Sequence, residues 1–322
     1  ACRAHHPPVT VLASAARVHE TLRPRGDVFR VTIDRTGERW DIEDSGDGTA
    51  ARALAYLKQR GAVAFIAMHG TYGEDGTVQR MLERAGIPYT GSGPDASALA
   101  MDKVRSAAVF EQHGLRTPQS MATTVTDDVS AAAFRTAILG AFSFPVIVKP
   151  TDRGSSFGVA VAEDATTLDA AIATAAAASP NLIAQAFLRG REVTCAVLDT
   201  GGTTVALPVT EIIPVESSFF DFSAKYAPGG SREITPADLP EHLTAAVQTA
   251  ARAAHEHLGC SGVSRSDFIL VGDHLFILET NTIPGITPTS LLPQGSAAAG
   301  ITFPDLLDHI IASALRRHER DQ

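Results

Sequence analysis

The chain has 322 residues, of which 44% are hydrophobic and 20% are charged. This balance is typical of a globular protein and gives room for about two domains. The formal net charge of −9 excludes general binding to nucleic acid, because an acidic surface repels the phosphodiester backbone. No apolar stretch approaches the ~20 residues that a membrane span needs, and no signal peptide is predicted. Cys2, Cys195 and Cys260 lie far apart in the chain, which favours a reducing cytoplasm over a disulfide framework.

Strands and helices alternate in the first hundred residues. The apolar run 62–68 predicts a buried strand, the spacing of 78–85 predicts a helix that Gly86 ends, and 87–90 predicts a second short strand. This βαβ order predicts a parallel α/β layer. We place the end of this first domain near residue 96.

The pattern changes after that point. One helix is predicted over 96–113, and strands are predicted at 146–149, 159–161, 182–187 and 193–198. The last two of these strands are joined at Arg189-Gly190. A hairpin is predicted over 268–279 around Gly272-Asp273, which requires antiparallel pairing. We therefore expect an α/β domain followed by a mixed α+β portion.

Two glycine motifs have alternative interpretations. Gly91 to Ala96 match the GxGxxA pattern of nicotinamide and flavin sites, but the acid that this pattern needs on the next strand is missing. A turn with Pro94 at the first helical position is favoured instead. Gly154 to Gly158 match the GxSxG pattern of a hydrolase, which needs a helix after the loop. A strand is predicted there, so we favour a loop that wraps a phosphate, with Lys149 as a nearby cation.

A histidine pair near the end of a predicted helix resembles a metal motif. His255 and His257 precede Cys260, but residues two apart on a helix point to different faces. We therefore expect no zinc site here.

Acidic residues near the end of the chain carry more weight. Glu279 and Asn281 are two apart on a predicted strand and so face the same side, and Asp267 lies on the paired strand. Leu275 and Ile277 are expected on that same face. Two carboxylates and an amide oxygen form a hard-oxygen site that suits Mg²⁺ carrying substrate phosphates.

Further motifs occur in a specific order. They are His69-Gly70 with Gly73 to Gly76 and Gln79; 87–93 (IPYTGSG); Ser97-Ala98 and Met101 to Lys103; 144–150 (FPVIVKP) with Gly154 to Ser156; 219–226 (FFDFSAKY); Cys260, Arg265 and Asp267; and Glu279 to Asn281, Pro284-Gly285 and Ser290-Leu291. Through them the chain resembles a D-alanine–D-alanine ligase of the ATP-grasp superfamily over about residues 62–316.

The resemblance implies an ATP-grasp fold, of class α/β and α+β, with three lobes. They are an N-terminal Rossmann-like α/β substrate-binding lobe (1–96), a central lobe (97–188) and a C-terminal lobe with the metal and second-substrate sites (189–322). ATP is then gripped between the last two lobes. Lys103, Lys149 and Lys225 contact its phosphates together with the loop at Ser156, and Glu192 holds the ribose. Phe187, Leu188, Phe219 and Leu278 sandwich the adenine, which Gln185 also contacts.

The resemblance also implies the chemistry. Asp267, Glu279 and Asn281 bind two Mg²⁺ ions, with Mn²⁺ as an alternative. Transfer of the γ-phosphoryl group converts the first D-alanine into an acyl phosphate, and the amine of the second attacks it to form D-alanyl-D-alanine for peptidoglycan synthesis. Arg265 and the Gly285 N–H stabilise the oxyanion. The remaining assignments are Ser155 and Tyr226 on closing loops and His69, Ser290 and Leu291 at the amino acids. The family also implies small-molecule partners and a homodimer.

The start of the chain departs from the family. Alignment of 12–18 puts Val9 where the family has a Glu that binds the first amino acid's ammonium. An ammonium buried without a carboxylate is costly. This keeps open a ligase of a specialised pathway with a different first substrate, and a non-catalytic nucleotide-binding homologue. Gln185 and Arg153 also stand where the family has Glu.

Overall fold

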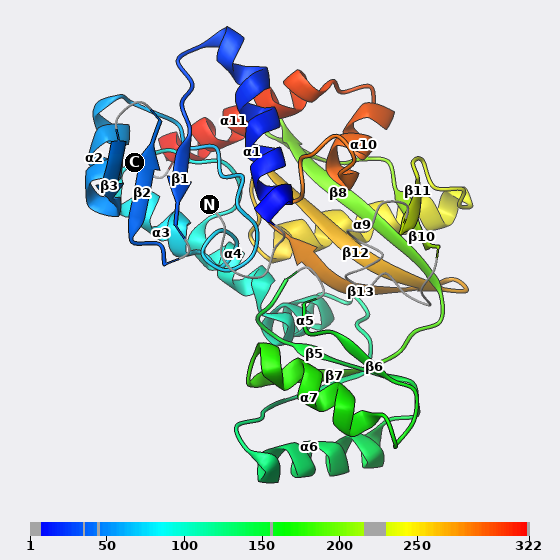
Figure 1. Ribbon diagram of the computed structural model, residues 1–322. Coiled ribbons are helices and arrows are strands. Elements are labelled where there is room, and N and C mark those ends of the chain that lie inside the picture. The colour runs from blue at the N-terminus through cyan, green and yellow to red at the C-terminus, as the bar shows by residue number, and fades with distance from the viewer. Residues whose placement is uncertain (1–7, 35, 44–45, 155–156, 216–229, 321–322) are drawn as a thin grey trace.

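The computed structural model describes residues 8–34, 36–43, 46–154, 157–215 and 230–320, and in this part of the chain three sheets are packed among helices (Figure 1). None of the described helices combines the length and the apolar character that crossing a membrane requires.

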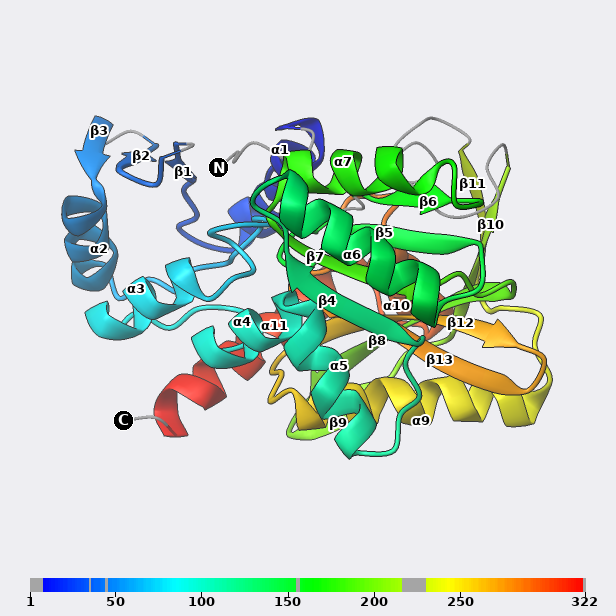
Figure 2. The ribbon, with the colours of Figure 1, turned by 90° about the horizontal axis from the view of Figure 1, so that it is seen from below.

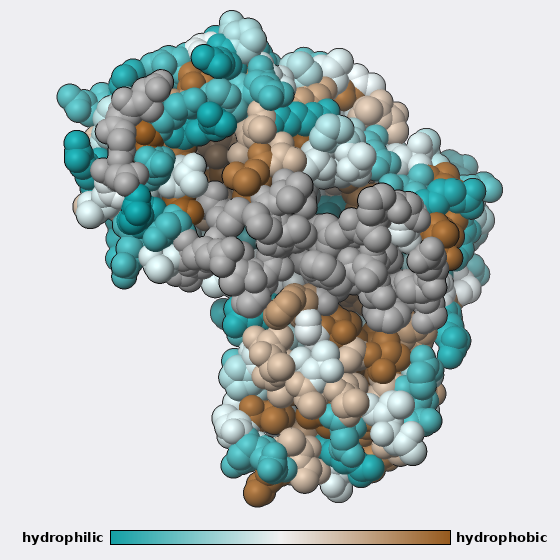
Figure 3. Space-filling view, in the orientation of Figure 1, coloured by the Kyte–Doolittle hydropathy of each residue, from teal (hydrophilic) through white to brown (hydrophobic). Residues whose placement is uncertain are grey.

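The first part of the chain surrounds a small antiparallel sheet. Its elements are α1 (Pro8–Leu22), the 3₁₀ helix η1 (Arg23–Arg25), β1 (Val31–Ile33), β2 (Arg39–Ile42), β3 (Gly46–Thr49), α2 (Ala50–Gln59) and α3 (Thr77–Ala85). The strands pair in chain order, and Trp40 lies in the core beneath them. Hydrophilic residues gather on the surface of this part, whereas the alanine-rich helix α7 gives a paler surface at the other end of the molecule (Figure 3).

The predicted βαβ unit is only partly formed. Helix α3 ends at Gly86, whose φ of 67° is left-handed, as predicted. The predicted strands at 62–68 and 87–90 shrink to one parallel bridge between Ala64 and Tyr89. The next N–H, that of Ile66, donates to the Thr90 side-chain oxygen at 3.0 Å. A side chain thus takes the place of a ladder hydrogen bond, and the parallel layer does not extend.

The single helix predicted over 96–113 is two helices. They are α4 (Pro94–Met101) and α5 (Lys103–Gln112). Asp102 between them is extended, and its side chain accepts hydrogen bonds from the N–H groups of Val104 and Arg105. This N-cap begins a new helix and places Lys103 in its first turn.

The middle of the chain forms a four-stranded antiparallel sheet in the order β4-β7-β5-β6. The strands are β4 (Ser120–Thr124), β5 (Val146–Pro150), β6 (Ala160–Ala162) and β7 (Asn181–Ala186), with helices α6 (Asp128–Ala141) and α7 (Leu168–Ala178). Val146 and Val148 are buried against these helices. Because side chains alternate along a strand, Ile147 and Lys149 project from the opposite face.

The last part forms a larger antiparallel sheet in the order β11-β10-β8-β12-β13, with β9 paired to β8. The elements are β8 (Arg191–Thr200), β9 (Thr203–Ala206), β10 (Thr210–Pro214), β11 (Ser231–Ile234), α9 (Glu241–His257), β12 (Val263–Val271), β13 (His274–Asn281), α10 (Leu291–Ala298) and α11 (Phe303–Arg320). The core residues place α9 against one face and α10 and α11 against the other. Seen from below, the four-stranded sheet and α9 lie on opposite sides of the β12–β13 hairpin (Figure 2).

Strands β7 and β8 are neighbours in sequence but belong to different sheets. The segment 187–190 between them passes from one sheet to the other, and it closes one side of the space that separates them.

Candidate active site

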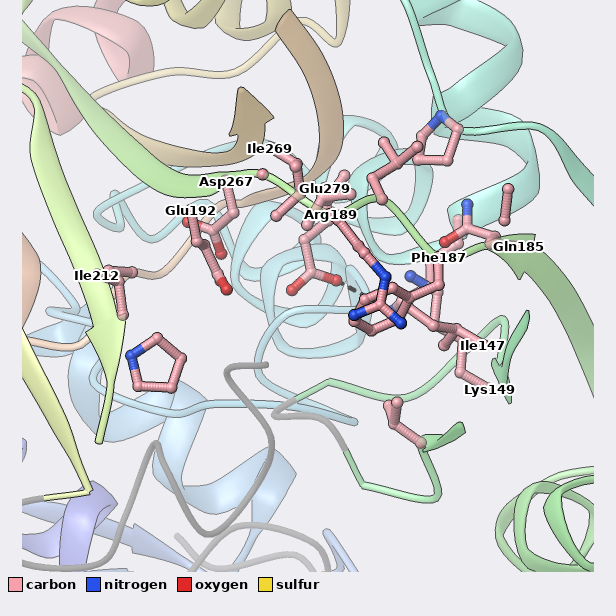
Figure 4. Close-up of a pocket in the computed structure, with 18 of the residues that line it drawn as sticks. Ile147, Lys149, Gln185, Phe187, Arg189, Glu192, Ile212, Asp267, Ile269 and Glu279 are labelled. Carbon is pink, nitrogen blue, oxygen red and sulfur yellow. Dashed lines mark ion pairs between the residues drawn. The ribbon is translucent and has the colours of Figure 1, made fainter. Parts of the chain in front are cut away.

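A cavity of about 490 Å³ lies between the four-stranded sheet and the large sheet. This volume is typical of a small-molecule or cofactor site. Its walls come from β5, β7, the 187–190 segment, β8, β10, β12 and β13 (Figure 4). Seven of the residues predicted to hold the nucleotide line it, namely Lys103, Lys149, Gln185, Phe187, Leu188, Glu192 and Leu278.

One end of the cavity has apolar walls. Ile147 of β5 and Phe187 lie on one side, and Ile269 and Leu278 of the hairpin lie on the other. Gln185 stands beside Ile147 on the neighbouring strand and is buried. This arrangement suits a flat ring with a polar edge. Ile269 was not predicted, although its spacing of two from Asp267 on β12 places both on one face.

The other end carries cationic side chains. Lys149 follows Ile147 by two residues, so its ammonium lies further along the same face of β5. Lys103 is buried, donates to the Arg153 carbonyl oxygen at 2.8 Å and forms an ion pair of 3.3 Å with Glu279. Two ammonium groups beyond an apolar slot are suited to the phosphates of a nucleotide.

The hairpin presents four polar side chains on one face. In the register of β12 and β13, Arg265 stands opposite Asn281 and Asp267 stands opposite Glu279. Arg265 donates to both carboxylate oxygens of Asp267 at 2.8 Å, and Thr194 donates to the same carboxylate at 2.7 Å. Burial opposes the charge of Arg265, but the carboxylates of Asp267, Glu279 and Glu74 together outweigh burial, so the pKa of the guanidinium is raised.

The prediction that Leu275 and Ile277 share a face with Glu279 and Asn281 is wrong. The register shifts so that Phe268 pairs with Ile277 while Asp267 pairs with Glu279, which leaves Leu278 as an extra residue. Leu275 and Ile277 therefore pack in the core against α9, whereas Leu278 and Glu279 line the cavity. Such a bulge re-aims the side chains that follow it.

The oxygen groups fit a hard divalent cation. Asp267 and Glu279 face the cavity, and the Asn281 amide nitrogen lies 3.4 Å from an oxygen of Asp267. Within the described residues, no three His, Cys, Asp or Glu side chains form a metal cluster. A cation here would therefore rely on the two carboxylates, the amide oxygen and ligand phosphates, which is the manner in which Mg²⁺ usually binds.

Two further side chains, those of His69 and Glu74, lie behind the hairpin, where both bond to the backbone of Ile283. The His69 Nδ1 atom bonds to the Ile283 carbonyl oxygen at 2.9 Å, and burial lowers the pKa of His69 to about 4. Glu74 accepts from the Gly70 N–H at 2.5 Å and from the Ile283 N–H, and burial raises its pKa to about 7. Glu74 was not predicted as a site residue, although it belongs to the motif that carries His69.

The remaining predicted residues form a separate cluster after β13. The Ser290 hydroxyl accepts from the Thr287 N–H at 3.0 Å, and Leu291 begins α10. A Cβ atom at Gly285 would lie 2.8 Å from the Ser290 oxygen, so the backbone at 285 passes close to that hydroxyl. These residues and Arg265 are not among those that line the cavity.

Several predictions fall outside the described residues. These are the roles of Ser155, Ser156, Phe219, Lys225 and Tyr226, and the position of the Val9 side chain. The segment that follows the GxSxG pattern forms strand β6 and not a helix, as predicted. His255 and His257 point to different partners, since His255 bonds to Ser264 while the His257 ring stacks on that of His113.

The sequence and the fold are similar to those of known proteins. Two family models match, "D-ala D-ala ligase N-terminus" over residues 10–92 and "D-ala D-ala ligase C-terminus" over residues 109–312. The D-alanine–D-alanine ligase of Anaeromyxobacter sp. (strain K) is 44% identical over 305 residues, which cover 94% of this chain and 91% of that protein.

Two solved structures are also similar. The VanG D-Ala:D-Ser ligase from Enterococcus faecalis has a TM-score of 0.80 at 29% identity and covers 96% of each chain. The D-alanine–D-alanine ligase from Bacillus anthracis complexed with ATP has a TM-score of 0.70 at 32% identity and covers 84% of this chain and 85% of that one.

Proposed function

The chain belongs to the D-alanine–D-alanine ligase family, and on this premise we propose that it is an ATP-dependent ligase that joins two D-alanines for peptidoglycan precursor synthesis. One observation carries the proposal. Lys103 and Lys149 meet Asp267 and Glu279 in a single cavity whose other end is an apolar slot. A nucleotide triphosphate needs an apolar site for its base and charged groups for its phosphates, and this cavity offers both.

The cavity residues divide the work of binding ATP. Phe187, Leu188 and Leu278 enclose the base, and Glu192 accepts hydrogen bonds from the ribose hydroxyls. Lys103 and Lys149 neutralise the phosphates and orient the γ-phosphoryl group. Positioning and electrostatic stabilisation supply most of the catalysis in phosphoryl transfer.

The carboxylates hold the metal in this proposal. Asp267, Glu279 and Asn281 would hold Mg²⁺, as two ions or with Mn²⁺ in its place, when the nucleotide binds. When bound, such ions offset the negative charge on the transferring phosphoryl group.

The second half of the reaction uses the groups behind the hairpin. A carboxylate is a poor acyl donor, whereas its acyl phosphate has a good leaving group. The amine of the second amino acid attacks that acyl group, and the oxyanion that forms is stabilised by Arg265 and the Gly285 N–H. Ser290 and the Leu291 N–H hold the second carboxylate, and His69 lies beside the amino-acid site. Ser155 and Tyr226 are proposed to exclude water when their loops close.

ADP release in the presence of D-alanine, with D-alanyl-D-alanine as product, tests the function. Glu279→Gln should abolish phosphoryl transfer while the protein stays folded, because it removes the charge of a metal ligand. Glu163→Gln, an exposed change on the β6–α7 connection, is the control. If Glu279→Gln releases phosphate from ATP at the parental rate, the metal assignment is refuted. ATP binding without turnover for any amino acid would favour a non-catalytic homologue.

A second amino acid other than D-alanine is the other candidate. The likeness to a D-Ala:D-Ser ligase favours D-serine as the alternative acceptor. Competition between the two acceptors, with the products separated by mass, decides between them.

The proposal also includes an assembly and an architecture. We infer a homodimer in the cytoplasm, with small molecules as the other partners, and lobes at 1–96, 97–188 and 189–322. Sedimentation of the purified protein tests the dimer, and limited proteolysis tests the lobe boundaries.

A further inference from the structure

The Gln185 amide is a buried polar group that lines the cavity. The residue is 4% exposed and stands on β7 directly opposite Ile147 of β5. Figure 4 shows Gln185 beside Phe187 on the cavity wall. Gln185 is therefore a polar residue on a cavity wall that is otherwise formed there by Ile147, Phe187 and Leu188. An amide that lines a cavity can donate to and accept from a ligand bound there, and such a ligand would shield these hydrogen bonds from water.

The surroundings of Gln185 limit what that ligand is. The neighbouring walls are apolar and aromatic apart from Arg189, whose guanidinium lies over the Phe187 ring at 5.4 Å. On the strand face of Ile147 the nearest cation is Lys149, two residues further along. Two residues of a strand span roughly 7 Å. A group at Gln185 is therefore separated from the phosphate end by about the length of a sugar. The hydrogen-bonding edge of a nucleobase fits that place.

A carboxamide does not select one direction of hydrogen bond. Its oxygen accepts and its NH₂ donates, and a half-turn of the amide exchanges the two. Adenine offers a 6-amino donor, whereas hypoxanthine offers a 6-oxo acceptor, and the amide satisfies either. A carboxylate at the same position has acceptors only, and it would leave a 6-oxo group facing a negative charge.

We propose that Gln185 pairs with the edge of the purine and that the site consequently accepts 6-oxopurine nucleoside triphosphates as well as ATP. The inference rests on the proposed ATP-dependent function and adds to it the range of nucleotides. Gln185 is then a specificity-determining residue, and the apolar walls bind either base equally.

The test measures kcat/KM for ATP and for ITP in the D-alanine reaction. The parent protein should use ITP within about tenfold of ATP, because neither base leaves a buried group unpaired. Gln185→Glu should lower the ITP/ATP ratio of kcat/KM by about tenfold or more, whatever its effect on ATP alone. Gln185→Met, which lacks both donor and acceptor, should weaken the two nucleotides to the same extent.

Gln112→Glu, an exposed change at the end of α5, is the matched control and should leave the ratio unchanged. The inference is overturned if the parent turns over ATP but rejects ITP by more than about a hundredfold, or if Gln185→Glu does not alter the ratio. If the parent has no ATP turnover, the proposed function fails separately. Equilibrium binding of ADP and IDP then decides the inference, since comparable affinities support it and binding of ADP alone overturns it.

Discussion

A basic and an acidic side chain, those of His69 and Glu74, bond to the backbone of the same residue, Ile283. His69 bonds to the Ile283 carbonyl oxygen and Glu74 accepts from the Ile283 N–H. Because a carbonyl oxygen only accepts, His69 carries its proton on Nδ1 and is neutral in the folded protein. The two groups contribute opposite pH dependences to the free energy of unfolding. Replacing one of them with a residue that does not titrate should therefore reveal the pH dependence that comes from the other.

The signs follow from the pKa shifts. The pKa of Glu74 is raised from 4.5 to about 7, so its contribution is fully present below pH 4.5 and is lost as the pH rises through about 7. The pKa of His69 is lowered from 6.5 to about 4, so its contribution is present above pH 6.5 and is lost as the pH falls toward 4. Between about pH 7.5 and pH 5, linkage gives a gain of about 2 kcal/mol from Glu74 and a loss of about 2 kcal/mol from His69. The two nearly cancel in the parent protein.

Urea unfolding at these two pH values measures the effect. Relative to the parent, Glu74→Gln should lose about 2 kcal/mol of unfolding free energy on going to the lower pH, and His69→Gln should gain about as much. Every other titrating group is common to the three proteins and cancels in the comparison. Glu241→Gln and His242→Gln, both exposed at the start of α9, are the controls. If both buried variants keep the parental pH dependence, the two groups are not buried in these ionisation states.

Three further predictions concern the framework of the site. Gly190→Ala should lower the unfolding free energy by about 2 kcal/mol or more, because its Cβ would lie 2.4 Å from the Leu270 carbonyl oxygen; an unchanged urea midpoint would contradict that close approach. Asp102→Ala should cost about 1 kcal/mol through loss of the α5 cap, with Asp102→Asn, which keeps an acceptor, as the control. Cys195 and Cys260 should resist alkylation in the native protein at mildly alkaline pH, because burial raises the pKa of each thiol to about 12; labelling at the rate of an exposed cysteine would refute their burial.

The sequence predicted the polar face of the hairpin because two-residue alternation is a strong local signal. Asp267, Glu279 and Asn281 do lie together on that face. The bulge at Leu278 was not predictable, since one extra residue changes which side chains face the core without changing composition. This bulge is the reason that Leu278 lines the cavity beside Glu279 and does not point away from it.

Long-range partners were harder to predict than local structure. The helix break at Asp102 had a local signal, a capping residue inside a helical pattern, but the continuous apolar spacing on both sides outweighed it. No local signal in the sequence indicated that β7 and β8 belong to different sheets, because strand pairing depends on contacts between distant segments. Glu74 likewise became a site residue only through Ile283, which is far from it in sequence.

The cap at Asp102 also bears on how the site is charged. It places the Lys103 ammonium in the first turn of α5, where the helix dipole is positive and the side chain is buried. A cation in that position needs an anion, and Glu279 supplies one at 3.3 Å. Breaking such a pair without replacement is strongly unfavourable. In the proposed function, a nucleotide bound with its metal would replace both partners at once, because phosphate would meet Lys103 while positive charge would meet Glu279. On that proposal the cavity favours a metal–nucleotide complex over either component alone, since nucleotide without metal would bring phosphate close to Glu279, and metal without nucleotide would bring positive charge close to Lys103.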